Sequence, residues 1–345
     1  MTRNILWGVL REYGVEGPLI RAVQSLYQRS RSLVRIAGCK SDLFPVRVGL
    51  RQGCPLSPVL FITFIDRISR RSWVVEGVEF GGQKISSLLF ADDVVLLAPS
   101  NRDLQQMLGR FATKCETAGM QISTSKSESM VLAQKKVECL LRVGEEVLPQ
   151  VEEFKYLGIL FTSESRMERE IDRRIGVASA VMRALNRSVV VKKELSWKAK
   201  LYVPVLTYGH QRWVMTKGTR SRIQAAEMSF LRRVAGLSLR DRVRSSDIRE
   251  GLGVEPLLLH IERSQLGSLG HLARMPSGCL PLEVFLTCPT GRRPRGWPRT
   301  RWRDYISRLA WERVGFPLEE LMEVAGERAV WASLLKLLPL RPGSG

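Results

Sequence analysis

The stretch SSLLFADDVVLLAPS, residues 86–100, places two adjacent carboxylates between two short apolar runs. The runs are short and rich in residues typical of strands, so they predict a β-hairpin with Asp92 and Asp93 at its tip. Turns favour aspartate because its side chain hydrogen-bonds to nearby backbone, which makes a polar turn the simplest interpretation. Hard divalent cations also prefer carboxylate oxygens, so a metal site is the alternative interpretation, for which the stretch by itself is weak evidence.

The composition indicates a folded protein with a polyanionic partner. The 345 residues are 44% hydrophobic, enough for one large core or two modest ones. Lysine and arginine number 54 against 34 aspartate and glutamate, which leaves a formal net charge of +20 at pH 7. This charge exceeds what solubility requires and has the sign that attracts nucleic acid. We therefore expect a nucleic acid as the partner.

Two segments carry much of this positive charge. Residues 217–249 contain nine basic and three acidic side chains, and residues 292–303 contain six arginines. Each segment taken alone is also typical of a solvated helix face. Together with the net charge, both are interpreted as phosphate-contacting surface. The predicted nucleic-acid contacts are Arg232, Arg233, Arg292, Arg293, Arg295, Arg299, Arg301 and Arg303.

Cysteine usage and hydropathy predict where the protein resides. The six cysteines show no paired spacing, the sequence opens with no apolar signal segment, and no run of about 18 apolar residues occurs. We expect an intracellular protein, nuclear or cytoplasmic, that is neither secreted nor bound to a membrane.

Periodicity predicts an α+β fold with an antiparallel sheet. Two helices are expected over residues 4–15 and 17–28, followed by strands over 32–38 and 44–50 that a polar turn at 39–42 joins. Ser57 and Pro58 then predict an N-cap and an N1 proline for a buried helix. Further predicted elements are a helix from about 101 to 118 that Gly119 ends, a strand over 120–133, and strand pairs around 141–148 and 153–162.

Beyond residue 163 the pattern becomes mainly helical. A long helix is expected around Ile171 to Leu185, a second over 196–215 with a kink at Pro204, and a third over 221–237. Residues 291–303 are too rich in Gly, Pro and Arg for regular structure.

Four motifs follow one another with short spacers: RQGCPLSPVLF (51–61), LLFADDVVLLA (88–98), GMQISTSKSESMVL (119–132) and FKYLGILF (154–161). This series strongly resembles the palm of the reverse transcriptases of non-long-terminal-repeat, or LINE-type, retrotransposons. The resemblance continues through LYVPVLTYGHQRWVM (201–215) and covers essentially the whole chain. It implies a partial polymerase palm over 1–163, a helical thumb-like region over 164–250, and a basic C-terminal region over 251–345 with an Arg/Pro/Gly-rich segment.

The resemblance also implies roles for individual residues. Asp92 would bridge both catalytic metals, Asp93 would be a weaker metal ligand, and Lys126 would lie near the pyrophosphate leaving group. An exposed lysine at a strand end explains Lys126 almost as well. The implied nucleotide and template contacts are Arg51, Gln52, Gly53, Phe90 and Ala91, and the implied primer contacts are Tyr156, Leu157 and Gly158.

One departure from the family pattern affects the expected activity. The family carries another metal-binding aspartate on a strand that precedes the segment corresponding to residues 3–15, and neither Asp42 nor Asp66 is placed by any pattern to replace it. We therefore expect an N-terminally truncated RNA-directed DNA polymerase that is inactive alone. If active, it would use Mg²⁺ or Mn²⁺, dNTPs and no other small-molecule cofactor, with an RNA template and a DNA primer or target as partners. The alternatives are a non-catalytic nucleic-acid-binding protein and a decayed insertion without a selected role.

Overall fold

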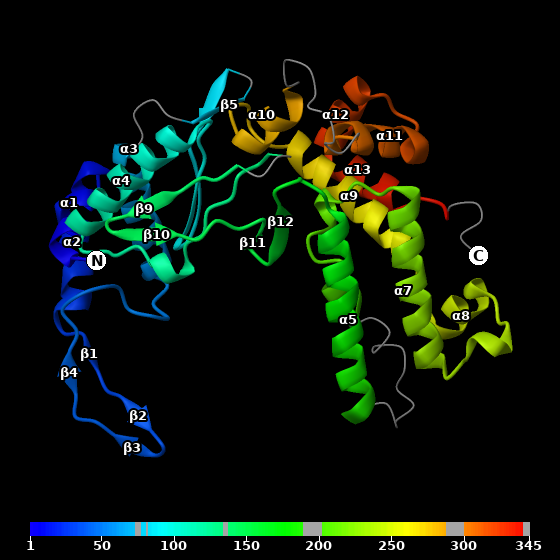
Figure 1. The fold of residues 1–345 in the computed structure, drawn as a ribbon, viewed down its shortest axis with the longest axis horizontal. Coiled ribbons are helices and arrows are strands. Elements are labelled where there is room, and N and C mark those ends of the chain that lie inside the picture. Colours follow the sequence, from blue (N-terminus) through cyan, green and yellow to red (C-terminus); the bar gives the residue numbers. More distant parts are fainter. Residues whose placement is uncertain (73–76, 81, 134–136, 189–201, 288–299, 341–345) are drawn as a thin grey trace. The chain divides into compact units, whose positions relative to one another are not determined.

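The computed structural model describes residues 1–72, 77–80, 82–133, 137–188, 202–287 and 300–340 (Figure 1). Contacts divide it into two compact units, Met1–Val131 with Val137–Val151, and Leu132–Lys136 with Glu152–Gly345. The described residues form small two-stranded antiparallel sheets with helices, followed by a mainly helical region. The predicted α+β class is confirmed. Among the same residues, no helix is long and apolar enough to span a membrane.

Four helices form the core of unit 1. They are α1 (Arg3–Glu12), α2 (Gly17–Gln28), α3 (Leu56–Ser72) and α4 (Asn101–Thr117). Their buried faces meet around Leu6, Phe64 and Phe111. The boundaries of α4 follow from local chemistry, because the Ser100 side chain accepts a hydrogen bond from Asp103 N at 3.1 Å and Gly119 takes a φ of 67° after the last turn.

Helix α3 starts two residues earlier than the Ser57 cap predicted. Its first residue is Leu56, and Ser57 Oγ donates to Arg51 O at 2.6 Å instead of accepting from the helix. Pro58 tolerates this start because the N–H groups of the first helical turn have no intrahelical partner. The prediction of a buried helix is confirmed, since Phe64, Ile65 and Ile68 are buried.

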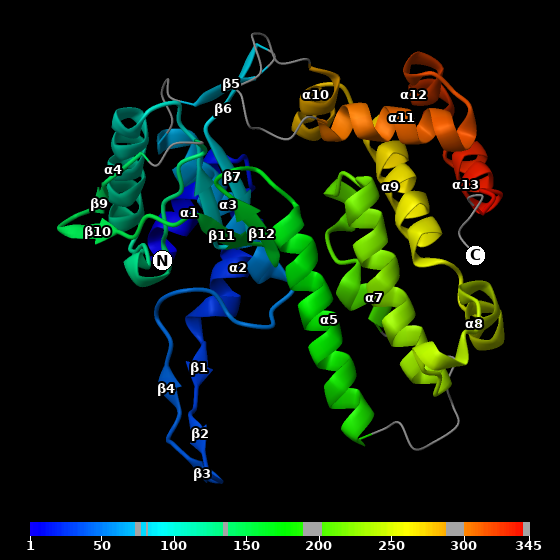
Figure 2. The same cartoon turned by 45° about the vertical axis from the view of Figure 1, so that its right-hand side comes forward.

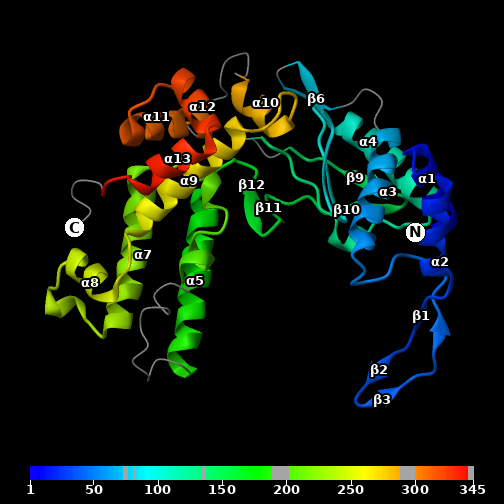
Figure 3. The ribbon, with the colours of Figure 1, turned by 180° about the vertical axis from the view of Figure 1, so that it is seen from behind.

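A narrow ribbon follows α2. It consists of β1 (Arg31–Ser32) paired with β4 (Phe44–Pro45) and β2 (Arg35–Ile36) paired with β3 (Cys39–Lys40) (Figure 3). The turn predicted at residues 39–42 is wrong, because the chain reverses at Ala37 and Gly38, with φ values of 47° and 90°. A glycine takes a positive φ without steric cost, which favours reversal at Gly38.

Three hairpins complete unit 1, namely β5 (Val78–Phe80) with β6 (Gln83–Ile85), β7 (Ser87–Phe90) with β8 (Asp93–Leu96), and β9 (Leu141–Val143) with β10 (Glu146–Leu148). The strand predicted over 120–133 is wrong. A 3₁₀ turn, η1 (Thr124–Lys126), and a single bridge from Ser129 to Gln150 replace it. Serine side chains hydrogen-bond to the local backbone, as Ser127 Oγ does to Ser123 O at 2.9 Å, and so compete with strand pairing.

Unit 2 begins with the hairpin of β11 (Glu153–Tyr156) and β12 (Ile159–Thr162), which leads into α5 (Glu168–Ser188). Residues 202–206 are helical, and η2 (His210–Arg212) follows. The helix predicted over 196–215 therefore ends at residue 206, before Gly209, which takes a φ of 79°. Residues 196–201 of that prediction lie outside the described residues.

The remaining elements of unit 2 are helices. They are α7 (Lys217–Ala235), α8 (Ser245–Leu252), α9 (Leu257–Ala273), α10 (Leu280–Leu286), α11 (Trp302–Val314), α12 (Leu318–Gly326) and α13 (Arg328–Lys336). Figure 2 shows α5 beside α7, and α9 packs against α7, α11, α12 and α13. The fully buried Ile261 and Leu269 of α9 contribute to the core. The helix predicted over 221–237 corresponds to α7, whereas α11 makes residues 302–303 helical rather than irregular.

Candidate functional site

The carboxylate doublet lies at a tight turn between β7 and β8. Phe90 pairs with Asp93, so only Ala91 and Asp92 form the turn, and Ala91 takes a left-handed φ of 51°. Both aspartates are exposed, and within the described residues neither side chain makes a hydrogen bond or ion pair. The predicted hairpin is confirmed, and its tip presents two exposed carboxylates.

The rest of the hairpin holds this turn against the core of unit 1. Val94 packs on the helical core and Leu96 on the small cluster beside α4. At the open end, Leu97 N donates to Ser86 O at 2.8 Å. The other face of the β7–β8 hairpin is open to solvent, because Leu88 and Phe90 are 38% and 58% exposed. An aromatic side chain therefore stands in solvent next to the carboxylates.

The donor set suits a hard divalent cation. Mg²⁺ prefers oxygen ligands and commonly takes one or two carboxylates, with water and substrate phosphate completing its shell. Asp92 and Asp93 supply these two carboxylates from adjacent positions. Among the described residues, no group of three or more His, Cys, Asp or Glu side chains could hold a metal ion. The doublet is thus a candidate site for one cation whose remaining ligands would be water and a phosphate.

The loop before α3 presents open backbone. Gly53 takes a φ of 78°, and a Cβ built on it would meet no atom within 4 Å. Arg51 and Gln52 are exposed beside it, and the Ser57 hydroxyl holds the loop by donating to Arg51 O. In the part of the chain that the structure describes, no hydrogen bond or ion pair joins Arg51 or Gln52 to the doublet.

Lys126 ends η1 and its side chain is exposed. Its backbone N–H donates to Ser123 O at 3.0 Å, which fixes the turn but leaves the ammonium in solvent. The strand-end setting expected for this lysine is wrong, since the residue lies in a 3₁₀ turn. Its predicted role at a leaving group stays a prediction.

The predicted primer contacts form the turn of the β11–β12 hairpin in unit 2. Tyr156 pairs with Ile159, and the turn residues Leu157 and Gly158 have φ values of 49° and 76°. Positive φ at both central residues is what a type I′ turn requires. The Leu157 side chain is 36% exposed, so the tip presents an apolar group to solvent.

The predicted arginine contacts have different surroundings. Arg232 donates to Val243 O at 2.9 Å, and Arg303 donates to Leu286 O at 2.8 Å, so both also hold loops of the fold. Arg233 is exposed on α7, and Arg301 caps α11. The predicted contacts outside the described residues are Arg292, Arg293, Arg295 and Arg299.

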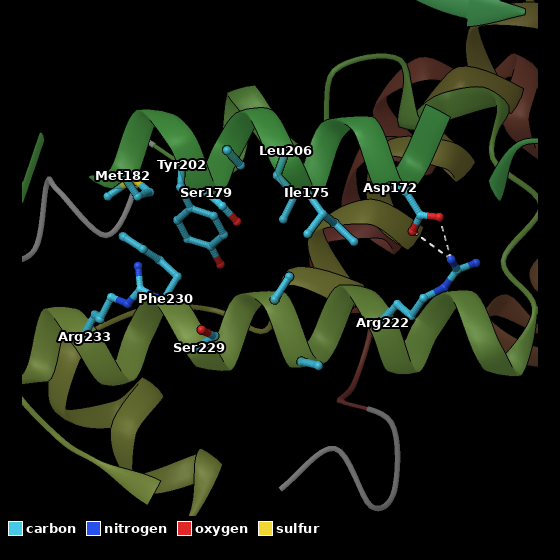
Figure 4. A pocket seen from close by; sticks show the side chains of 13 residues that line it. Asp172, Ile175, Ser179, Met182, Tyr202, Leu206, Arg222, Ser229, Phe230 and Arg233 are labelled. Carbon is cyan, nitrogen blue, oxygen red and sulfur yellow. Dashed lines mark hydrogen bonds and ion pairs between the residues drawn. The ribbon is translucent and has the colours of Figure 1, made fainter. Parts of the chain in front are cut away.

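A cleft of about 380 Å³ separates α5 from α7 (Figure 4). At one end Arg222 Nη1 donates to both carboxylate oxygens of Asp172, at 2.7 and 2.9 Å, and Arg233 reaches in at the other. The Tyr202 hydroxyl points between the two helices; it has no hydrogen-bond partner among the described residues, and burial raises its pKa. The cleft walls are otherwise mostly apolar.

Comparison with known proteins shows what residues 4–161 are similar to. They match the family model described as reverse transcriptase (RNA-dependent DNA polymerase). These residues resemble a reverse transcriptase. The matched range includes the doublet at Asp92 and Asp93, the loop at Gly53 and the turn at Gly158.

Three of the proteins that the chain is similar to derive from transposable elements. A transposon-derived protein of Caenorhabditis elegans is 27% identical over 274 residues, 74% of this chain and 96% of that protein. The Pol polyprotein from the type-2 retrotransposable element R2DM of Drosophila melanogaster is 30% identical over 172 residues, 47% of this chain and 16% of that protein. The RNA-directed DNA polymerase from mobile element jockey of the same species is 24% identical over 253 residues, 69% of this chain and 27% of that protein. The chain thus spans a small share of the last two relatives.

Sequence reasoning missed the residues that support the Leu157–Gly158 turn. Arg174 and Tyr208 donate hydrogen bonds to carbonyl oxygens of this turn, and Glu170 accepts a hydrogen bond from Arg174. Tyr208 belongs to a motif that contributed to the resemblance, but its spacing from the turn has no periodic signal.

Proposed function

We propose that this chain is an RNA-directed DNA polymerase domain of a LINE-type retrotransposon that binds a primed RNA template and dNTPs. The observation that supports the proposal is the pair of exposed carboxylates, without a side-chain partner among the described residues, on a tight turn inside the range that matches the reverse transcriptase family model. We assign residues 1–163 to the palm, 164–250 to the thumb-like region and 251–345 to the basic C-terminal region.

Asp92 and Asp93 would hold Mg²⁺ or Mn²⁺. A cation bound there would activate the attacking primer hydroxyl and neutralise charge on the triphosphate. The open backbone at Gly53 gives a nucleotide close access, and the exposed Phe90 offers an apolar surface to its sugar or base. The ammonium of Lys126 is free to approach the charge of the leaving pyrophosphate.

We further propose that the chain alone does not extend primers at a measurable rate. Nucleotidyl transfer of this kind uses two metal ions, and two carboxylates meet the needs of one. Within the described residues, no further His, Cys, Asp or Glu joins Asp92 and Asp93 in a possible metal-binding group.

Primer extension tests both statements. The purified chain is given an RNA template with an annealed DNA primer, labelled dNTPs, and Mg²⁺ or Mn²⁺, with Asp92→Asn as the matched control. We expect no template-dependent incorporation from either protein. Incorporation that Asp92→Asn abolishes would refute the inactivity and support the catalytic role of the doublet. Incorporation that persists in Asp92→Asn would refute that role.

A second function, nucleic-acid binding without catalysis, is favoured by the net charge of +20. Binding that neutralises several phosphates weakens linearly on a log–log scale as salt rises, with a slope near −0.9 per phosphate on duplex DNA. Filter binding or fluorescence anisotropy of a template–primer duplex between about 50 and 200 mM salt measures this slope. The absence of binding at low salt, or a flat slope, would refute both proposed functions.

A further inference from the structure

The turn at Leu157 and Gly158 has an unfavourable backbone conformation. Leu157 takes a φ of 49°, in the left-handed region that disfavours residues with a Cβ. Its side chain is 36% exposed, so burial of the leucine is not what compensates for this conformation. Strained backbone of this kind persists only where surrounding groups hold it, and it concentrates at sites that clamp ligands.

Two arginines of α5 hold the turn from one side. Arg173 donates to Gly158 O at 2.7 Å, and Arg174 donates to the same oxygen. The fully buried carboxylate of Glu170 orients both guanidinium groups, at 2.9 Å from Arg173 Nε and 2.6 Å from Arg174 Nε. It also accepts from Leu160 N at 3.0 Å, so the same acid fixes the strand that follows the turn.

Tyr208 holds the turn from the other side. Its hydroxyl donates to Leu157 O at 2.9 Å, and the Arg174 guanidinium lies 4.6 Å from its ring centroid. The approach is close enough that a Cβ on Gly158 would lie 3.3 Å from the tyrosine ring, and one on Gly209 would lie 3.0 Å from Ile159. Glycine is therefore required at both positions for this contact.

The strained turns of two other hairpins lack such support. Ala37 and Ala91 also take left-handed φ values at hairpin turns. Within the described residues, no side chain hydrogen-bonds to the carbonyl of either alanine. At Leu157 and Gly158, by contrast, three side chains donate to the two carbonyls. The support thus distinguishes the turn that carries the predicted primer contacts from these two hairpin turns.

We propose that Tyr208, Arg174 and Glu170 are positioning residues that fix the Leu157–Gly158 turn so that its exposed tip contacts the end of a primer strand. The inference rests on the proposed function, because it takes a primed template as the ligand. Arg174 links the two sides of the support, since it contacts Gly158 O, Glu170 and the ring of Tyr208. Substituting any of the three frees the turn without touching the Asp92 doublet.

Tyr208→Phe tests the proposal, since it removes one hydroxyl and keeps the ring. Tyr202→Phe is the matched control, because the Tyr202 hydroxyl is buried in the same unit and has no hydrogen-bond partner among the described residues. Two quantities are measured for the full chain and both variants. The first is hydrogen exchange over residues 156–160. The second is the ratio of affinities for a recessed primer–template and a blunt duplex of equal length.

We expect wild-type protein and Tyr202→Phe to prefer the recessed end. In Tyr208→Phe, hydrogen exchange over the turn should accelerate by about 2- to 12-fold, the ratio expected for loss of one hydrogen bond. The preference for the recessed primer–template should fall at least about threefold, while the affinity for the blunt duplex stays constant. Unchanged hydrogen exchange would refute the support of the turn by Tyr208. Faster exchange with an intact preference for the recessed end would refute the positioning role of Tyr208. A wild-type protein that binds duplex with the expected salt slope but ignores the recessed end would overturn the inference and leave the proposed binding function intact.

Discussion

Two glycines of α9 offer a sharp test of how unit 2 is packed. A Cβ on Gly270 would collide with the indole ring of Trp331, which is 2% exposed and donates its Nε1–H to Leu266 O at 3.0 Å. A Cβ on Gly267, one turn earlier, would meet only Leu335 Cδ1 at 3.9 Å, an ordinary contact. The same substitution should therefore have opposite effects at the two sites.

The magnitudes follow from the local terms. Alanine in place of a helical glycine stabilises by about 0.5–1 kcal/mol, which Gly267→Ala should realise in full. Gly270→Ala gains the same amount, but overpacking costs about 1–3 kcal/mol and a buried indole N–H that loses its acceptor costs about 1–3 kcal/mol. We expect Gly270→Ala to lose about 1–5 kcal/mol of unfolding free energy.

Urea unfolding followed by circular dichroism measures both variants against wild type. The double variant Gly270→Ala/Trp331→Phe adds a coupling test, because a smaller ring relieves the collision and should make the combined loss smaller than the sum of the single losses. Equal unfolding midpoints for Gly270→Ala and Gly267→Ala would refute the packing of α13 against α9 through Trp331.

Glu227→Ala should lower the unfolding free energy by about 3–5 kcal/mol, because it removes the carboxylate that lies 2.9 Å from the buried Arg249 guanidinium. Urea unfolding measures this loss, and the control variant Glu227→Met/Arg249→Met should lose far less. Iodoacetamide at pH 8 should label Cys54 before Cys115. A backbone N–H at the start of α3 lowers the pKa of the Cys54 thiol, whereas burial raises the pKa of the Cys115 thiol to about 11. Equal labelling rates in peptide mass spectrometry would contradict this order. Burial favours a higher pKa for Glu170, but the hydrogen bonds from two arginines outweigh burial and lower this pKa. The Glu170 carboxylate therefore stabilises the fold above its ordinary pKa of 4.5, and this contribution is lost as pH falls through the lowered, folded-state pKa. Glu170→Gln should show a shallower loss of unfolding free energy in acid than wild type.

Local signals predicted the elements that local chemistry determines. Residues within one or two turns of chain specify the N-terminal helices, the end of α4 at Gly119 and the hairpin around Asp92. The errors lie where two local solutions compete. Strand alternation in residues 120–133 lost to serine hydrogen bonds, and a polar turn after Cys39 lost to the positive φ that Gly38 adopts freely.

The candidate site was predictable only in part for the same reason. The doublet at Asp92 and the turn at Gly158 are continuous in sequence, so a motif reveals them. The support of that turn joins Gly158 to Arg174 and Leu157 to Tyr208, across 16 and 51 residues. No periodicity connects positions so far apart, and only the folded structure brings them together.

The 51-residue interval between Leu157 and Tyr208 has a consequence for biosynthesis. Synthesis adds both arginines of α5 before the tyrosine, so Tyr208 is the last of the three supporting side chains to enter the chain. A stop codon placed between Arg174 and Tyr208 would yield a polypeptide that retains the carboxylate doublet and both arginines but lacks the Tyr208 hydrogen bond to the turn. A truncation of this kind would remove the full support of the turn before it removes the hairpin itself.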